Sequence, residues 1–199
     1  MLKVYLLRHG ETAWNADNNR YCGRTDIPLT EKGLLQANEV RRQLEGIDID
    51  HVYSSPLQRA FTTASIASGM HVTTDHRLIE ADFGEWEKKT KEEFIAENES
   101  LWTNWILDPS THRAGGNGET GSEIVTRVDD FFQSIQAKHK TGNIMVVAHN
   151  GVNRLYMAYK LGMPLKNYRQ LVQQNSSVTC FTLDDNAVLT LEFLNSKLR

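Results

Sequence analysis

Short apolar runs, separated by amphipathic stretches, recur along the chain. Leu2–Leu7 is apolar apart from Lys3 and ends abruptly at charged residues, as a buried parallel strand does. The same pattern predicts strands over five further ranges: His51–Ser54, His71–Thr74, Ile144–Ala148, Ser177–Leu183 and Ala187–Leu194. The turn residues between the last two predict an antiparallel hairpin at the end of the chain.

Two of the amphipathic stretches have clear helix starts. Thr30 precedes apolar residues that recur at helical spacing up to Leu44. Ser55 and Pro56 offer a serine N-cap and a proline at the first helical position, and Gly69 is the expected stop. We therefore predict one helix on either side of the His51–Ser54 strand.

Two capping boxes mark further helices. Thr90–Glu93 and Thr120–Glu123 each combine a threonine with a glutamate three residues later, and each should open a helix. Another helix should follow His149 and end at about Leu161. The segment 98–118, which contains Pro109, predicts an irregular excursion instead.

Strands that alternate with helices predict an α/β fold: a three-layer α/β/α sandwich with a mostly parallel central sheet and a C-terminal antiparallel hairpin. The 199 residues suit a single domain over 1–199. Ligands of such sheets bind beyond the carboxyl ends of the strands. His9 and His149 each follow an apolar strand immediately, so both imidazoles should lie on the same rim.

Composition narrows the class of protein. The chain is 40% hydrophobic and 24% charged with a formal net charge of −3, which fits a soluble globular domain and disfavours a nucleic-acid scaffold. Cys22 and Cys180 lie far apart and predict neither a disulfide framework nor a zinc cluster. The apolar run at the N-terminus is too short for a signal peptide, and no stretch is long enough to span a bilayer. We expect a cytoplasmic protein without a membrane partner.

The expected rim carries the groups that phosphate chemistry needs. Arginine donates two hydrogen bonds at once and stays charged, histidine can act as a nucleophile near neutral pH, and a protonated carboxyl group can protonate a leaving alkoxide. One candidate exists for every role: Arg8, His9, Asn15, Arg59, Glu80 and His149.

Four motifs in order give these residues a family context. Leu7–Asn15 reads LRHGETAWN and resembles the signature of the histidine phosphatase superfamily, the phosphoglycerate mutase-like proteins. Ser54–Ala60 is similar to the family's second-arginine motif, Leu78–Glu87 to its acid-bearing segment and Val146–Val152 to its second-histidine motif. Gly23–Gly33 resembles the family's loop and first helix. The resemblance covers nearly the whole chain and implies a phosphoglycerate mutase-like fold.

The resemblance also implies roles. His9 would be the phosphorylated nucleophile and Glu80 the proton donor and then acceptor, although Glu11, Glu85 and Glu87 are nearby alternatives for the acid. His149 would assist catalysis. The phosphate would be held by Arg8, Asn15, Arg59 and His149.

Other positions match the family less closely. Cys22 and Gly23 fall where members offer hydroxyl and backbone donors to substrate, and a thiol is the poorer donor. Asn150 replaces a glycine often found after the second histidine and could contact substrate. Lys88 stands where a glycine is usual, which could alter the turn beside Glu80.

The implied enzyme is a phosphoric monoester hydrolase that needs no cofactor and no metal, since the arginines supply the electrostatic stabilisation. Residues 81–120 are expected to form a lid or insert over the active site. The expected partner is a small-molecule phosphomonoester rather than nucleic acid, and a homodimer remains open.

Two other functions stay open. A phosphoglycerate mutase of the same family would have an extended insertion with an Arg-Arg pair between the acid and the second histidine. This interval contains Arg113 and Arg127, which are not adjacent. The third hypothesis is a catalytically silent module that binds phospholigands, and the complete set of catalytic residue types argues against it.

Overall fold

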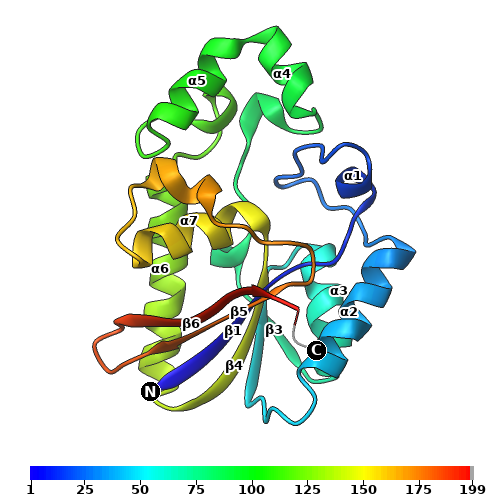
Figure 1. The fold of residues 1–199 in the computed structure, drawn as a ribbon, viewed down its shortest axis with the longest axis vertical. Coiled ribbons are helices and arrows are strands. Elements are labelled where there is room, and N and C mark those ends of the chain that lie inside the picture. The colour runs from blue at the N-terminus through cyan, green and yellow to red at the C-terminus, as the bar shows by residue number, and fades with distance from the viewer. Residues whose placement is uncertain (198–199) are drawn as a thin grey trace.

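The computed structural model describes residues 1–197, which contain a six-stranded sheet with helices on both faces (Figure 1). The strands are β1 (Leu2–Arg8), β2 (His51–Ser54), β3 (Val72–Thr74), β4 (Gly142–Ala148), β5 (Val178–Leu183) and β6 (Leu189–Ser196). Their order across the sheet is β3-β2-β4-β1-β5-β6. The first four in this order are parallel, whereas β5 runs antiparallel to both β1 and β6. The expected α/β fold with its C-terminal hairpin is therefore confirmed.

The helices also follow the predicted order. They are α1 (Ala13–Ala16), α2 (Glu31–Gln43), α3 (Gln58–Ser68), α4 (Lys91–Glu97), α5 (Glu99–Leu107), α6 (Gly121–Lys138) and α7 (Asn150–Lys160). Short 3₁₀ turns are η1 (His76–Leu78), η2 (Gly84–Trp86), η3 (Ala114–Gly116) and η4 (Leu165–Gln170). Both predicted capping boxes are present, at Thr90 and Thr120, and Thr30 caps α2.

The three layers arise from alternation along the strands. In β1, Val4 and Leu6 pack into the core that contains α6 and α7, whereas Tyr5 and Leu7 pack into the core that contains α2 and α3. Successive side chains of a strand point to opposite faces, so a strand covered on both sides must be apolar throughout. This explains why Leu2–Leu7 reads as a continuous apolar run.

The start of α3 differs from the prediction. Ser55 is not its N-cap and Pro56 is not its first residue, because the helix begins at Gln58 after Leu57. The Ser55 hydroxyl instead accepts a hydrogen bond from the Leu57 N–H at 3.3 Å. The Gln58 N–H donates to the Asp26 carboxylate at 2.8 Å, so a remote loop supplies the acceptor that an N-cap side chain normally provides.

The segment predicted to be irregular contains a helix. Residues 99–107 form α5, which Figure 1 shows beside α4 beyond the carboxyl ends of the parallel strands. Trp102 and Trp105, three positions apart, are buried with Trp86 and Phe94 in a separate aromatic cluster. Packing of this apolar face stabilises a helix that is too short to be stable by itself.

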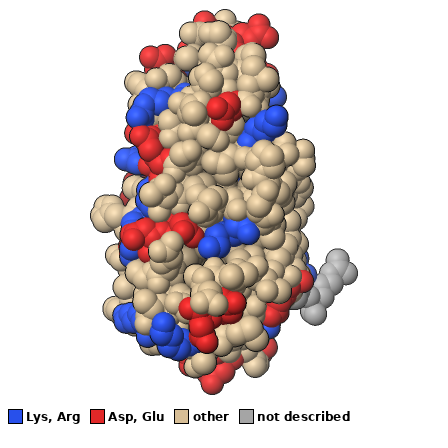
Figure 2. All heavy atoms as spheres, turned by 90° about the vertical axis from the view of Figure 1, so that its left-hand side faces the viewer, with Lys and Arg blue, Asp and Glu red and all other residues tan. Residues whose placement is uncertain are grey.

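Surface charge is mixed. Figure 2 shows acidic and basic side chains interspersed over the face that it displays. Among the helices in residues 1–197, we find none with the length and apolar character needed to cross a membrane.

Candidate active site

The two rim histidines meet because β1 and β4 are parallel neighbours. Arg8 is paired with Ala148 in the sheet register, and the His9 N–H donates to the Ala148 carbonyl at 3.1 Å. Each strand therefore delivers a histidine to the same place at its carboxyl end. The ring centroids of His9 and His149 lie 5.2 Å apart, which confirms that the two residues are neighbours in space.

A backbone carbonyl fixes the tautomer of His9. Its Nδ1 lies 2.6 Å from the Gly10 carbonyl oxygen. A carbonyl oxygen can only accept, so Nδ1 carries the proton and the neutral ring keeps its lone pair on Nε2. The Gly10 N–H donates in turn to the Thr63 hydroxyl at 3.0 Å, so α3 holds the residue that orients the imidazole.

Burial and positive charge keep both rings neutral. The pKa of His9 lies well below its ordinary value, first because the ring is buried and then because Arg59 and Arg8 are close. Burial and the charge of Arg59 also depress the pKa of His149. Neutral imidazole is the form in which His9 has a lone pair to use at pH 7.

Several buried nitrogen atoms around His9 lack a hydrogen-bond partner among residues 1–197. They are both ring nitrogens of His149, Nε of Arg8 and Nε of Arg59. Buried polar groups are nearly always paired in folded proteins. A tetrahedral oxyanion can accept from the two guanidinium N–H groups and from the one ring nitrogen of neutral His149 that carries a proton.

Arg59 is fully buried and binds a loop as well as facing this cluster. Its terminal nitrogens donate to the carbonyl oxygens of Thr25 at 2.8 Å, Gly23 at 2.7 Å and Cys22 at 3.3 Å. Three carbonyl acceptors fix the plane of the guanidinium group. Arg59 therefore shapes the Cys22–Thr25 loop, a role that the sequence did not indicate.

Arg8 and Asn15 are oriented by similar contacts. Arg8 donates through Nη1 to the Gln173 carbonyl at 2.9 Å, and burial lowers its pKa to about 10, which still leaves it charged at neutral pH. The Asn15 amide oxygen accepts from the Thr12 N–H and from the Asn175 amide, each at 3.1 Å. With the oxygen engaged, the Asn15 NH₂ group is what remains to donate to a ligand.

The carboxyl group of Glu80 is held by backbone donors. Oε1 accepts from the N–H groups of Ala81 at 2.9 Å and Val152 at 3.1 Å, and Oε2 accepts from Gly151 at 3.0 Å. Burial raises the pKa of Glu80, and these hydrogen bonds and the charge of Arg59 oppose that effect in part. Oε2, with one donor, is the oxygen better placed to carry a proton.

The backbone that carries Glu80 is held by Arg127 from α6. Its guanidinium group donates to the carbonyl oxygens of Arg77 at 2.6 Å and Ile79 at 2.8 Å. The same group forms an ion pair with Glu119 at 2.9 Å. One of the two arginines considered for a mutase thus stabilises the acid-bearing segment.

The alternative acids point elsewhere. The Glu11 carboxylate is bound to Lys32 and Thr30, and the Glu87 carboxylate accepts from the N–H groups of Gly23 and Thr25. Glu85 is exposed. Within residues 1–197, the acidic side chains that line the cavity over His9 are Glu80 and Glu92.

This cavity has a volume of about 450 Å³ and opens between β1, α7 and the α4–α5 segment. Arg8, His9, Asn15, Cys22, Glu80 and Asn150 line it, together with Gly151. Gly23 does not, because its N–H points to Glu87 and its carbonyl to Arg59. The expectation that Gly23 offers its backbone donor to substrate is not met in this structure.

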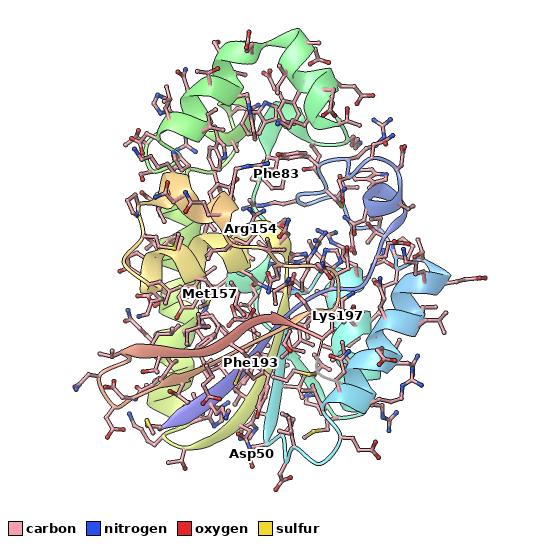
Figure 3. All side chains as sticks on the ribbon, viewed as in Figure 1. Asp50, Phe83, Arg154, Met157, Phe193 and Lys197 are labelled. Atoms are coloured by element: carbon pink, nitrogen blue, oxygen red, sulfur yellow. The ribbon has the colours of Figure 1, made fainter. Side chains whose placement is uncertain are left out.

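Sequence reasoning missed several residues of the cavity wall. They are Asn18, Asn19, Arg20, Tyr21, Phe83, Lys91, Glu92, Arg154, Tyr168 and Arg169. Arg154 lies one helical turn after Asn150 on α7, so its place on the same face could have been found from the spacing. Arg169 lies in η4, where no periodic pattern marks which side chain faces the site. Figure 3 shows Phe83 and Arg154 in the space between α7 and the α4–α5 segment.

Lys88 adopts a backbone conformation that is typical of glycine. Its φ is +70°, in the left-handed region that favours glycine. The turn is held by two hydrogen bonds: the Lys88 N–H donates to the Tyr21 carbonyl at 2.9 Å, and the Arg20 guanidinium group donates to the Lys88 carbonyl at 3.2 Å. Among the described residues, we find no cluster of three or more histidine, cysteine or acidic side chains that could hold a metal ion.

Known proteins resemble this chain over nearly its whole length. Residues 4–196 match the family model of the histidine phosphatase superfamily (branch 1). The chain is 34% identical to a protein of Erwinia tasmaniensis named probable phosphoglycerate mutase GpmB, over 90% of this chain and 84% of that protein. It is 30% identical to phosphoserine phosphatase 1 of Hydrogenobacter thermophilus, over 96% and 92% of the two chains. The crystal structure of phosphoserine phosphatase from Entamoeba histolytica in complex with 3-phosphoglyceric acid superposes with a TM-score of 0.90 at 29% identity and covers both chains completely.

Proposed function

Because this chain belongs to branch 1 of the histidine phosphatase superfamily and is a phosphatase, we propose that it hydrolyses a small-molecule phosphomonoester through a phosphohistidine on His9. The observation that carries the proposal is the hydrogen bond between His9 Nδ1 and the Gly10 carbonyl. It leaves the lone pair on Nε2 of a ring that lines the cavity.

In the first step, the phosphate group binds to Arg8 and the Asn15 amide, which line the cavity. The unpartnered nitrogens of Arg59 and His149, which are fully buried behind the cavity wall, are the further donors. His9 Nε2 attacks phosphorus as the bond to the ester oxygen breaks. Positive charge around the equatorial oxygens stabilises the transition state. It also reduces the electrostatic repulsion between these oxygens and the lone pair of the attacking nitrogen.

Glu80 supplies the proton that the leaving alkoxide needs. Its raised pKa favours a protonated carboxyl group, and a bound phosphate dianion favours that form further. The proton moves from Glu80 to the ester oxygen, and the alcohol leaves neutral. Glu80 is then a carboxylate beside phosphorylated His9.

In the second step the roles reverse. The Glu80 carboxylate takes a proton from water, the water oxygen attacks phosphorus, and the bond to His9 Nε2 breaks. Inorganic phosphate, free His9 and protonated Glu80 are the products, so the cycle closes without net change in the enzyme. We propose that residues 81–120, with the aromatic cluster of α4 and α5, form the lid over the leaving group.

Phosphatase and mutase activity differ in the fate of the phosphohistidine. A mutase must return the phosphate to the bound alcohol, and the arginines between Glu80 and His149 would be expected to help hold it. Arg113 instead pairs with Glu123 at 2.8 Å, and Arg127 pairs with Glu119 at 2.9 Å. Neither lines the cavity among the described residues. This supports hydrolysis over mutase chemistry.

The experiment is to incubate the protein with 3-phosphoglycerate and with p-nitrophenyl phosphate and to measure inorganic phosphate. We expect phosphate release from both, and loss of release in His9→Ala. Accumulation of 2-phosphoglycerate without release of phosphate would assign mutase activity. Binding of phosphate without turnover of any ester would support the silent binding module.

A further inference from the structure

The side chains that line the cavity over His9 carry a net positive charge, whereas the chain as a whole is slightly negative. Five arginine or lysine side chains line it against two glutamates, whereas the whole chain has a formal net charge of −3. Arg8 lies at the floor with His9 and belongs to the proposed phosphate site. The remaining four, Arg20, Lys91, Arg154 and Arg169, lie farther out along the wall.

Three of these outer cations have no acidic partner in the part of the chain that the structure describes. Arg20 forms ion pairs with Asp17 and Glu93. Among residues 1–197, we find no carboxylate oxygen within 4 Å of the cationic nitrogens of Lys91, Arg154 or Arg169. Unpaired arginines that converge on a cavity are a typical anion site.

Aromatic rings hold these side chains in position. The Arg154 guanidinium carbon lies 5.2 Å from the centre of the Tyr168 ring, and Arg154 Nε donates to the Tyr168 carbonyl at 3.3 Å. The Arg169 guanidinium carbon lies 4.8 Å from the centre of the Trp102 ring, and its Nη1 lies 3.5 Å from the Tyr21 hydroxyl. Stacking uses the faces of the guanidinium groups and leaves N–H donors at their edges for a ligand.

The position of Arg154 places this charge next to the reacting groups. Arg154 lies on α7 four residues after Asn150, so both face the same side of the helix, and both line the cavity. The positive charge of Arg154 contributes to lowering the pKa of Arg8, and the charge of Glu80 acts to raise the pKa of Arg154. Arg154 is half-buried and Arg169 is exposed at the rim. A ligand with its phosphate at His9 would have the guanidinium groups of Arg154 and Arg169 in the wall around its alcohol part.

From this geometry we propose that Arg154 and Arg169 form a second anion-binding subsite, which selects phosphomonoesters whose alcohol part carries another anionic group. The proposal rests on hydrolysis at His9. In this proposal, Arg154 on α7 and Arg169 in η4 bind a negatively charged group on the leaving alcohol. That group is either a carboxylate or a second phosphate.

Three substrates with one carbon skeleton test this subsite. Glycerol 3-phosphate has an uncharged alcohol part, 3-phosphoglycerate adds a carboxylate, and glycerol 1,3-bisphosphate adds a phosphate. We expect the wild-type protein to prefer at least one of the two anionic esters over glycerol 3-phosphate in kcat/KM, and the better of them identifies the anion. Arg154→Gln and Arg169→Gln should each lower kcat/KM for that ester by about 10- to 100-fold, the scale of a lost charge-assisted hydrogen bond.

Glycerol 3-phosphate is the internal control, because each variant should lose far more kcat/KM on the anionic ester than on this ester with its uncharged alcohol part. Lys160→Gln provides the matched control, since Lys160 lies on the same helix and pairs with Asp129 at 3.2 Å. Equal losses on all three substrates, or no preference in the wild-type protein, would overturn the subsite while leaving hydrolysis intact. Failure to release phosphate from any ester would overturn the proposed function itself.

Discussion

The carboxylate of Glu80 accepts a hydrogen bond from the backbone N–H of Gly151 at 3.0 Å. Gly151 lies in the first turn of α7, and Val152 in the same turn donates to the other carboxylate oxygen. His149 precedes this helix and forms no side-chain cap. A glutamate 71 residues earlier in the chain thus caps the helix that begins beside the second histidine, and the position of the acid is coupled to that of His149.

Gly151→Ala should move the Glu80 carboxyl group away from the backbone N–H groups that bind it. A Cβ atom at this position would lie 2.7 Å from Glu80 Oε1, so the carboxyl group must move. We expect kcat for glycerol 3-phosphate to fall by about 10- to 100-fold, part of what general acid catalysis typically contributes. Competitive inhibition by vanadate should change little, because the phosphate ligands are retained. Wild-type kcat would show that the carboxyl group tolerates this displacement.

Glu80→Gln should slow the turnover of a substrate more strongly when its leaving group is more basic. An alkyl phosphate leaves as a strongly basic alkoxide and needs the proton, whereas p-nitrophenolate leaves without it. We expect kcat for glycerol 3-phosphate to fall by about 10² to 10⁴-fold. The initial burst of p-nitrophenol from p-nitrophenyl phosphate should be far less affected, although its steady-state rate can fall because Glu80 also activates water.

The decisive comparison is between the p-nitrophenol burst and alkyl-phosphate turnover in the same variant. Equal losses in both would mean that Glu80 shapes the site without donating a proton.

The pH profile should reflect two pKa shifts of opposite sign. The pKa of buried His9 is well below 6.5, and burial raises the pKa of Glu80 above 4.5. The reactive form has neutral His9 and protonated Glu80, so kcat/KM should fall as the pH drops through the first pKa and as it rises through the second. Glu80→Gln should remove the alkaline limb measured with glycerol 3-phosphate.

The wild-type protein and the variant are compared on the same substrate, so that ionisation of the substrate phosphate affects both equally. An alkaline limb that persists unchanged in Glu80→Gln would assign it to a different group.

Lys88→Gly should stabilise the protein. The left-handed φ of +70° at Lys88 costs a non-glycine residue about 1–2 kcal/mol, and the greater freedom of glycine in the unfolded chain offsets part of this gain. We expect the free energy of unfolding, measured with urea, to rise by about 0.5–1 kcal/mol. Lys89→Gly, at a neighbour without a positive φ, should lower it. A loss of stability in Lys88→Gly would indicate that its side chain contributes more than the strained backbone costs.

The sequence predicted what depends on strand ends and local caps. His9 and His149 could be placed together because each follows an apolar strand, and parallel neighbours end at the same edge. Thr90 and Thr120 predicted helix starts because a capping box uses residues only three positions apart. These features are local, or follow from sheet topology alone.

Features that depend on remote contacts could not be predicted. The start of α3 is set by Asp26, which lies 32 residues before Gln58. Gly23 was placed with the substrate ligands by analogy, but Glu87 takes its N–H from 64 residues away. Arg169 faces the cavity because Trp102 and Tyr21 hold it there. The local sequence around these positions does not indicate which distant residues they contact.

The central claim is that phosphate passes through His9, and trapping the phosphorylated protein tests it most directly. The protein is mixed briefly with an excess of ³²P-labelled substrate, quenched in base and digested, and the labelled peptide is identified by mass spectrometry. We predict a phosphate on His9 that survives base and is lost in acid, as an N-phosphate is, and its absence in His9→Ala. Label that persists in His9→Ala, or label on a residue other than His9, would contradict the account.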